Sequence, residues 1–299
     1  MAMTRADKLV TKVLLCVIVM SGAVACLTSC SKESEDEMVN GQSSMVNDTQ
    51  VSITFSPYEM TPMTRAATSI SGIVTKLDVW ISDGVTSTDL HQTSSDDGFG
   101  LISVSLNRTK TYTLTAVAHR ASGAATLTDG VIAFPDEKVT HAMICQTTFS
   151  PATTTSLSCL MQRIVAMIRF EIADQVPANA YTMRFELGES FTQWNLSTAT
   201  GANAIERTTS FNNFSRANDG TAAFSVYVIP TNLTNTDNIN VTVTALTQGG
   251  DEIESKTFED VPVKAGYKTT YHGEFFTTEG ATGSFTVEED WGTFDTITY

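Results

Sequence analysis

The side chains of this chain that could do covalent or metal chemistry are few, and they lie far apart in the sequence. Four histidines are scattered along it, and five cysteines occur, namely Cys16, Cys26, Cys30, Cys145 and Cys159. A thiolate can bind zinc, pair in a disulfide or act as a nucleophile, but a structural zinc site needs four ligands. Scattered histidines and two central cysteines do not supply that set. Covalent modification of the cysteines is therefore the chemistry to consider, and no metal or other cofactor is predicted.

Cys30 ends a segment with the layout of an export signal. Basic residues at positions 5, 8 and 12 precede an apolar run, 13–20, and small residues follow. The run is too short for a membrane-spanning helix. Its ending, Leu27-Thr28-Ser29-Cys30, resembles the lipobox of bacterial lipoproteins. The resemblance implies that signal peptidase II cleaves between Ser29 and Cys30 and that the Cys30 thiol carries lipid. The alternative is an ordinary signal peptide in which Cys30 is a free thiol.

A polar and charged segment, 31–47, follows Cys30 and begins with Ser-Lys-Glu-Ser-Glu-Asp-Glu. It has too few apolar residues to bury a core, so residues 30–50 are predicted to form a disordered acidic tether. The lysine followed by acidic residues also resembles the signal that sends lipoproteins of Bacteroidetes to the outer face of the outer membrane. This resemblance implies a lipid-anchored protein at the cell surface, whereas a simple solvated spacer explains the same residues.

The chain is strongly acidic. It has 18 Lys and Arg residues against 33 Asp and Glu, a formal net charge of −15. Removal of residues 1–29 leaves 15 basic and 32 acidic residues, a net charge of −17. Such a surface repels nucleic acid and anionic lipid headgroups, so neither is expected as a partner. Attachment to the outer membrane would depend on the acyl chains at Cys30, which contribute about 0.8 kcal/mol per buried CH₂.

The pattern of apolar residues predicts an all-β fold. Apolar and polar residues alternate in many short runs rich in Thr and Ser, and helical spacing is scarce. A mature chain of about 270 residues suggests two domains. The predicted domains are 51–157 and 158–299, with Ser150 to Ser158 as their connection and 197–220 as a polar insertion. The longest alternating run, 160–172, is predicted to be a single strand.

Cys145 and Cys159 each lie close to an apolar strand pattern. In an oxidising compartment they could pair in a disulfide. Two buried free thiols are equally compatible with the sequence, because Cys is among the most buried residue types.

The motifs of the common enzyme classes are absent from the sequence. It has no Gly-x-Ser-x-Gly elbow, no His-Glu-x-x-His, no P-loop and no dinucleotide fingerprint. Turn chemistry explains Asp96-Asp97-Gly98 and Asn218-Asp219-Gly220 better than calcium binding does. Paired glycosidase carboxylates would be brought together only by the fold. A structural or adhesive role, and not an enzymatic one, is expected.

A family resemblance is carried by three stretches. They are LMQRIVAMIRF at 160–170, FEDVPVKAGYKTTYHGEFF at 258–276, and Trp291-Gly292. Together they resemble the fimbrillins of Bacteroidetes, in particular the FimB-type fimbrial anchor branch. The resemblance implies two tandem transthyretin-like (Greek-key) β-sandwich domains and assembly with other fimbrial subunits into a cell-surface fimbria. Assembly would use donor-strand exchange, in which a strand of one subunit fills an open groove of the next.

The same resemblance makes Arg65 the residue that separates two roles. Stalk subunits of the family are cut after an arginine in the first loop, which expels the first strand. Here a cut between Arg65 and Ala66 would release Cys30 together with the strand predicted at 51–56, whereas an anchor must keep its lipid. The FimB-like segment 261–276 favours the anchor. A stalk or tip subunit, or a solvated loop arginine, is the alternative.

A carbohydrate-binding surface lipoprotein of a glycan-uptake system is the second function considered. In that case Trp80, Trp194 or Trp291 would be exposed and would stack on sugar rings, and a host surface or glycan would be the partner. Core packing is favoured for each tryptophan, because a buried aromatic ring removes a large apolar area from water.

Overall fold

The computed structural model describes residues 47–58, 69–277 and 283–288. These residues form seventeen β-strands and one 3-10 helix, η1 (Pro135–Glu137), and they include no α-helix, so the all-β prediction is confirmed. Within these ranges no helix has the length and apolar character to cross a membrane. The expected signal segment, 1–29, lies outside the described residues. Strand β1 begins at Asp48, inside the range expected for the tether.

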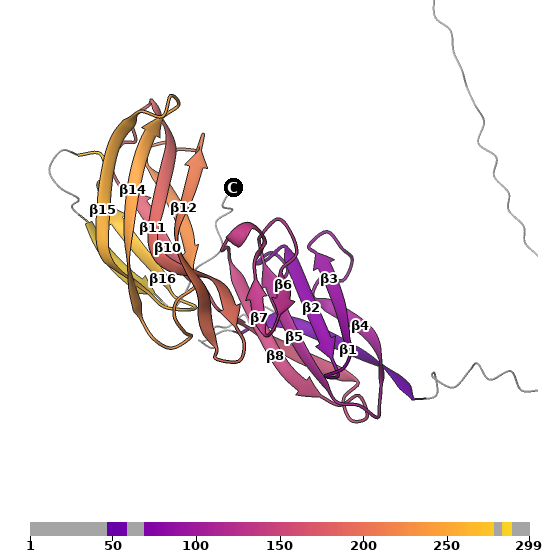
Figure 1. The fold of residues 1–299 in the computed structure, drawn as a ribbon. Coiled ribbons are helices and arrows are strands. Elements are labelled where there is room, and N and C mark those ends of the chain that lie inside the picture. Colours follow the sequence, from indigo (N-terminus) through magenta and orange to yellow (C-terminus); the bar gives the residue numbers. More distant parts are fainter. Residues whose placement is uncertain (1–46, 59–68, 278–282, 289–299) are drawn as a thin grey trace, which may run out of the picture. The chain divides into compact units, whose positions relative to one another are not determined.

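The first part of the chain supplies nine strands (Figure 1). They are β1 (Asp48–Pro57), β2 (Lys76–Ser82), β3 (Ser87–Thr93), β4 (Leu101–Asn107), β5 (Tyr112–His119), β6 (Thr126–Thr128), β7 (Val131–Ala133), β8 (Ala142–Phe149) and β9 (Ser156–Arg163). Seven of these strands form one hydrogen-bonded path in the order β3-β2-β5-β8-β9-β1-β4. Buried residues from both ends of this path belong to one hydrophobic cluster, so the path turns back on itself into two facing layers. We call this the first cluster.

The second part supplies eight strands. They are β10 (Ala166–Ile172), β11 (Ala180–Asn195), β12 (Thr200–Asn212), β13 (Ala222–Val228), β14 (Asp237–Thr247), β15 (Glu252–Val263), β16 (Lys268–Gly273) and β17 (Gly283–Glu288). One sheet has the order β13-β10-β16-β17, and the other contains β15-β14-β11, with β12 also paired to β11. Apolar side chains of both sheets meet in a second cluster.

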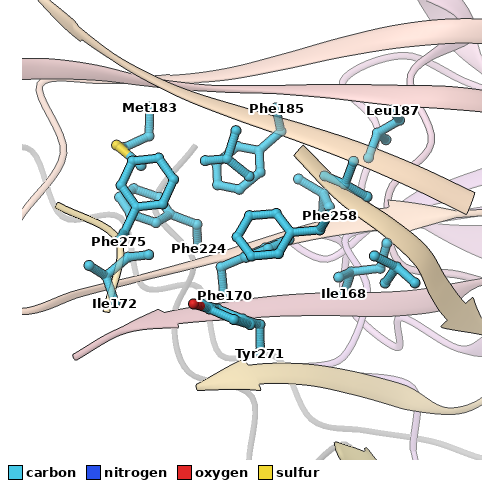
Figure 2. Packing of buried hydrophobic residues seen from close by; sticks show 14 of the residues in the cluster. Ile168, Phe170, Ile172, Met183, Phe185, Leu187, Phe224, Phe258, Tyr271 and Phe275 are labelled. Carbon is cyan, nitrogen blue, oxygen red and sulfur yellow. The ribbon is translucent and has the colours of Figure 1, made fainter. Parts of the chain in front are cut away.

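Phe170 of β10 lies at the centre of the second cluster. Its ring centroid is 5.3 Å from that of Phe185, 5.2 Å from that of Phe258 and 5.7 Å from that of Tyr271. Figure 2 shows these side chains converging from strands on both sides of the core. Aromatic pairs at such distances contribute about 0.5–1.5 kcal/mol each beyond their burial. Phe170 therefore links the two sheets of this part.

A third cluster contains side chains from both parts of the chain. Trp194 of β11 and Tyr227 of β13 lie in it together with Trp80 of β2 and Val117 of β5. Backbone pairing also joins the parts, because residues 193–195 of β11 pair with β7. The β11 sheet thus continues through β7 to β6. The two parts share a buried core as well as a chain connection.

The prediction of a single strand over 160–172 is wrong, because the chain leaves one sheet and enters another at Ile164 and Val165. Strand β9 pairs with β1 and β8, whereas β10 pairs with β13 and β16. Both residues at the break are fully buried in the third cluster, so the apolar pattern continues where the strand stops. The expected connection at 150–158 instead joins β8 to β9, and the expected boundary at 157/158 falls inside β9.

The segment 197–220, expected as a polar insertion, contains the thirteen-residue strand β12. Its residues alternate between partly buried and exposed positions, and its neighbour is β11. A strand at the edge of a sheet needs only one weakly apolar face, so its sequence looks polar. The segment was predicted to be an insertion because its partly buried positions include Ile205, Arg207 and Thr209, and a central strand would have a more apolar set there.

We predict that Phe170→Ala lowers the free energy of unfolding by about 3–5 kcal/mol, because it leaves a cavity between two packed sheets. Denaturant unfolding followed by circular dichroism measures the change. Leu160→Ala is the control, because Leu160 is 55% exposed and its truncation is expected to change stability by about 0.5 kcal/mol or less. Equal effects of the two substitutions would contradict the packing described for Phe170.

Candidate functional site

Strand β1 occupies a central position in its sheet, and the place that it fills is the candidate functional site. Residues 48–54 pair antiparallel with β4, and residues 52–57 pair in parallel with β9. We call the space between β4 and β9 the β1 seat. Because β1 is bonded along both edges, its departure would leave two strand edges without partners, which is the arrangement that accepts a strand from another chain.

Three side chains of β1 extend into the first cluster. Val51, Ile53 and Phe55 are at most 1% exposed, whereas Thr54 between them is exposed. Apolar side chains on one face at a period of two explain why this short segment forms a strand. Their burial contributes roughly 5–9 kcal/mol relative to exposure. The seat is therefore an apolar groove that requires a strand with this pattern.

Gly100 closes one end of the β1 seat. Its carbonyl accepts a hydrogen bond from the Phe55 N–H at 2.9 Å, and its φ is +87°, which favours glycine. A Cβ at this position would lie 3.1 Å from Cγ1 of Ile70. Ile70 is fully buried in the first cluster. The chain therefore returns to the core at Ile70, soon after the segment 59–68 that follows β1.

The residues expected for lipidation and processing lie outside the described residues. They are Ser29, Cys30, Arg65 and Ala66. Both flanks of the segment that carries Arg65 are described, and both are held in the core. Pro57 is buried at the end of β1, and Ile70 is buried on the other side.

The structure brings Cys145 of β8 and Cys159 of β9 together in a disulfide, with their Cα atoms 6.2 Å apart. Cys159 lies opposite Phe55 on the parallel ladder between β1 and β9. The bond closes a loop over a sequence separation of 14 residues, for which the chain-entropy model gives about 3 kcal/mol of stabilisation. The disulfide therefore holds one wall of the β1 seat and leaves β1 itself unlinked.

A buried carboxylate on β2 joins residues that are isolated in the sequence. Asp78 of β2 is 1% exposed. It accepts hydrogen bonds from His119 Nε2 at 2.8 Å, His91 Nδ1 at 2.7 Å and the Ala125 N–H at 2.7 Å. The Ala121 N–H donates to His119 Nδ1 at 3.1 Å, so the proton of neutral His119 is on Nε2. Asp78 thus holds together β2, β3, β5 and the segment after β5.

Burial raises the pKa of Asp78, but the hydrogen bonds from His119, Ala125 and His91 outweigh it and keep this pKa below its usual value. The sequence analysis missed this cluster, because Asp78, His91 and His119 lie far apart in the chain and are brought together only by the pairing of β2 with β3 and β5. The segment carrying Ala125, Ile132 and Phe134 covers that face. The local signal is a carboxylate between the apolar residues Leu77 and Val79.

Two of the three tryptophans considered as sugar platforms are buried. Trp80 is 7% exposed and Trp194 is 0% exposed, and both belong to the third cluster. Neither can stack on a sugar ring in this structure. Trp291 lies outside the described residues.

The chain was compared with protein-family models, with curated proteins and with solved structures. A family model described as "Family of unknown function (DUF6562)" matches residues 84–295. No curated protein matches the sequence. A candidate cell adhesion protein from Bacteroides ovatus has a similar structure, with 16% sequence identity, a TM-score of 0.50, and coverage of 83% of this chain and 99% of that chain. At this identity the likeness establishes a shared fold and nothing more.

Two further solved structures are more distant. A candidate adhesin from Bacteroides thetaiotaomicron is 12% identical, with a TM-score of 0.47 and coverage of 80% of this chain and 95% of that chain. The fimbrial anchor protein Mfa2 from Porphyromonas gingivalis is 10% identical, with a TM-score of 0.43 and coverage of 80% and 97%. Scores below 0.5 carry no argument about function.

For the β1 seat, we predict that Phe55→Ala lowers the free energy of unfolding by about 3–5 kcal/mol, because it empties the groove opposite Cys159. Thr54→Ala, one residue away and exposed, is expected to change it by about 0.5 kcal/mol or less. Urea unfolding of the oxidised protein measures both. A small effect of Phe55→Ala would mean that β1 does not contribute to the core.

For the buried carboxylate, we predict that Asp78→Asn lowers the free energy of unfolding by about 3 kcal/mol at pH 7, because one of the two acceptor oxygens becomes an NH₂ group that faces buried donors and the charge is lost. Asp89→Asn, on exposed β3, is the matched control. The folded pKa of Asp78 lies below its usual value of 3.8, so its contribution is present above pH 3.8 and is lost as the pH falls through the folded pKa. Unfolding curves between pH 7 and pH 2 should therefore show the wild type and Asp78→Asn converging at low pH; a constant gap would contradict this.

Proposed function

The chain belongs to the DUF6562 family, and we propose that it is a lipid-anchored structural subunit of a cell-surface fimbria, serving as an anchor or minor subunit at the outer membrane. The observation that carries the proposal is the placement of β1, which is bonded on both edges and is the first strand of the described residues. The lipobox-like ending at Cys30 supports a membrane tether. The fold shared with a candidate cell adhesion protein of Bacteroides ovatus is compatible with a surface role.

Strand exchange at the β1 seat would join subunits. A single cut between Arg65 and Ala66 would separate β1 from the rest of the chain, since the Cys145–Cys159 disulfide links only β8 and β9. An incoming strand would regain the main-chain hydrogen bonds to β4 and β9. Its alternate apolar side chains would replace Val51, Ile53 and Phe55 in the groove.

The anchor role and the stalk or tip role differ in whether the chain is cut after Arg65. Lipid at Cys30 lies on the same side of Arg65 as β1, so a cut subunit would lose both its lipid and its first strand. An anchor would keep both, and its own β1 would occupy the seat. We assign the anchor role on the FimB-like segment 261–276, because β1 occupies the seat in any chain that has not been cut.

We also propose that the two parts of the chain are tandem transthyretin-like sandwiches, preceded by a signal peptide, 1–29, and a tether that begins at Cys30. The facing layers around the first and second clusters support this division. In this proposal the boundary between the two sandwiches lies at Ile164–Val165, between β9 and β10.

Mass spectrometry of the N-terminal peptide tests the proposal on protein isolated from the surface of cells that express it. The anchor role predicts a lipid-modified Cys30 start and incorporation of labelled palmitate. Cys30→Ser should abolish both labelling and surface retention, whereas Arg65→Gln should leave them unchanged. An Ala66 start would replace the anchor role with that of a cleaved stalk or tip subunit. Absence of both acylation and association with any fimbria would overturn the proposal entirely.

A further inference from the structure

A cleft of about 870 Å³ is lined by residues of β12 and β13. Strand β12 pairs with β11, and β13 pairs with β10. On its other edge β12 bonds at its start to the segment after β13, where Thr200 bridges Asn232 and the Gly201 N–H donates to the Thr231 carbonyl at 2.9 Å. The cleft is lined by residues of both strands, by the segment after β12 and by η1 with the residues that follow it. It lies apart from the β1 seat and shares no residue with it.

Arg207 of β12 is a cation in this cleft whose hydrogen-bond partners are neutral. Its Nε donates to Ser190 Oγ at 3.1 Å, and its Nη2 donates to the Tyr227 carbonyl at 2.9 Å. Both partners are neutral, and Arg207 forms no ion pair with any residue that the structure describes. Burial lowers the pKa of Arg207 to about 10, as expected for a cation that has lost water without gaining a carboxylate. A buried charge in a folded protein usually has a charged partner.

Ser225 of β13 adds a second group without a partner. Its side chain is 3% exposed, and its Oγ has no hydrogen-bond partner among the described residues. Buried hydroxyl groups are nearly always paired, so an unpaired one in the wall of a cleft points to a missing ligand or water. Ser225 lies two residues before Tyr227, the residue whose carbonyl holds Arg207.

The charge of the cleft differs from that of the chain. The net charge of the whole chain is −15, yet three cations line this cleft, Lys138, Arg169 and Arg207, against the two acids Asp136 and Glu137. Glu137 already accepts a hydrogen bond from Asn203 Nδ2 at 3.0 Å. Arg169 pairs with Glu171 at 2.8 Å, whereas the two hydrogen-bond partners of Arg207 named above are both neutral.

Aromatic and hydroxyl groups form the rest of the wall. Phe211 and Phe214 are partly buried and pack on Phe224, with ring centroids 5.4 Å and 5.0 Å from it. Thr209, Ser210 and Asn212 line the cleft beside these rings. Such side chains can pair with the hydroxyl groups of a sugar, while a ring face packs against its C–H face.

We propose that this cleft binds an acidic saccharide, with the guanidinium of Arg207 holding the carboxylate of a uronic or sialic acid unit. Arg is the side chain best suited to this contact, because its planar fork pairs with both carboxylate oxygens. An acidic peptide would use the same charge, but the combination of aromatic rings with hydroxyl side chains favours a saccharide, whose C–H faces and hydroxyl groups match both. This site is independent of strand exchange and of the anchor role.

Isothermal titration calorimetry with purified, oxidised protein tests the site. The probes are tri-galacturonic acid and 3′-sialyllactose, each beside its neutral counterpart, tri-galactose and lactose. At least one acidic probe should bind at least tenfold more tightly than its neutral counterpart, and more weakly as salt is raised. Arg207→Gln should weaken that binding at least tenfold. Arg184→Gln removes the same charge from neighbouring β11 outside the cleft and should leave it unchanged.

Thr209→Trp provides a second variant that fills the cleft without removing charge, and it too should weaken binding at least tenfold. Thermal unfolding establishes that each variant is folded. The proposal is overturned if neither acidic probe binds at millimolar concentration, or if neutral and acidic probes bind alike. It is also overturned if a folded Arg207→Gln or Thr209→Trp binds as the wild type does, or if a tri-glutamate peptide binds more tightly than both saccharides.

Discussion

The parallel pairing of β1 with β9 is the interaction on which the first part of the molecule depends. A central strand has to find partners for the N–H and C=O groups on both of its edges, and β1 does so between β4 and β9. Its apolar side chains also complete the first cluster. The disulfide from Cys145 to Cys159 and the turn at Gly100 hold the walls around it. The walls of the groove are therefore built by residues outside β1.

The second part repeats this arrangement with a different chain order. Strand β10 pairs in parallel with β16, which in turn pairs antiparallel with β17, just as β9 pairs with β1 and β1 with β4. In the first part the parallel partner comes from the beginning of the chain, whereas in the second part it comes from near the end. A single cut in the segment after β1 would free only the first of these strands. The two strands are paired alike, so β1 differs from β16 in its position along the chain and not in its pairing.

Asp78, which is buried, and Arg207, which is half-buried, illustrate two ways in which a folded chain accommodates charge. Asp78 has three hydrogen-bond donors around its carboxylate, so its charge is compensated where it lies, and it links three strands to the segment that covers them. Arg207 has only neutral partners among the described residues, and it lies in a cleft that remains open. A satisfied group of the first kind stabilises structure, whereas an incompletely satisfied one of the second kind is suited to binding.

The all-β class and the positions of most strands could be predicted from the sequence, because alternation with a period of two is a local property that Val51, Ile53 and Phe55 display without reference to any partner. The lipobox-like ending at Cys30 is likewise a linear signal. The break at Ile164–Val165 could not be predicted, because residues buried in a junction continue the apolar pattern past the end of a strand. Strand β12 was hidden because an edge position tolerates polar residues. The contact of Asp78 with His91 and His119, the Cys145–Cys159 pair and the cleft at Arg207 are decided only by the tertiary structure, because each joins strands whose pairing is set by long-range packing and not by neighbours in the chain.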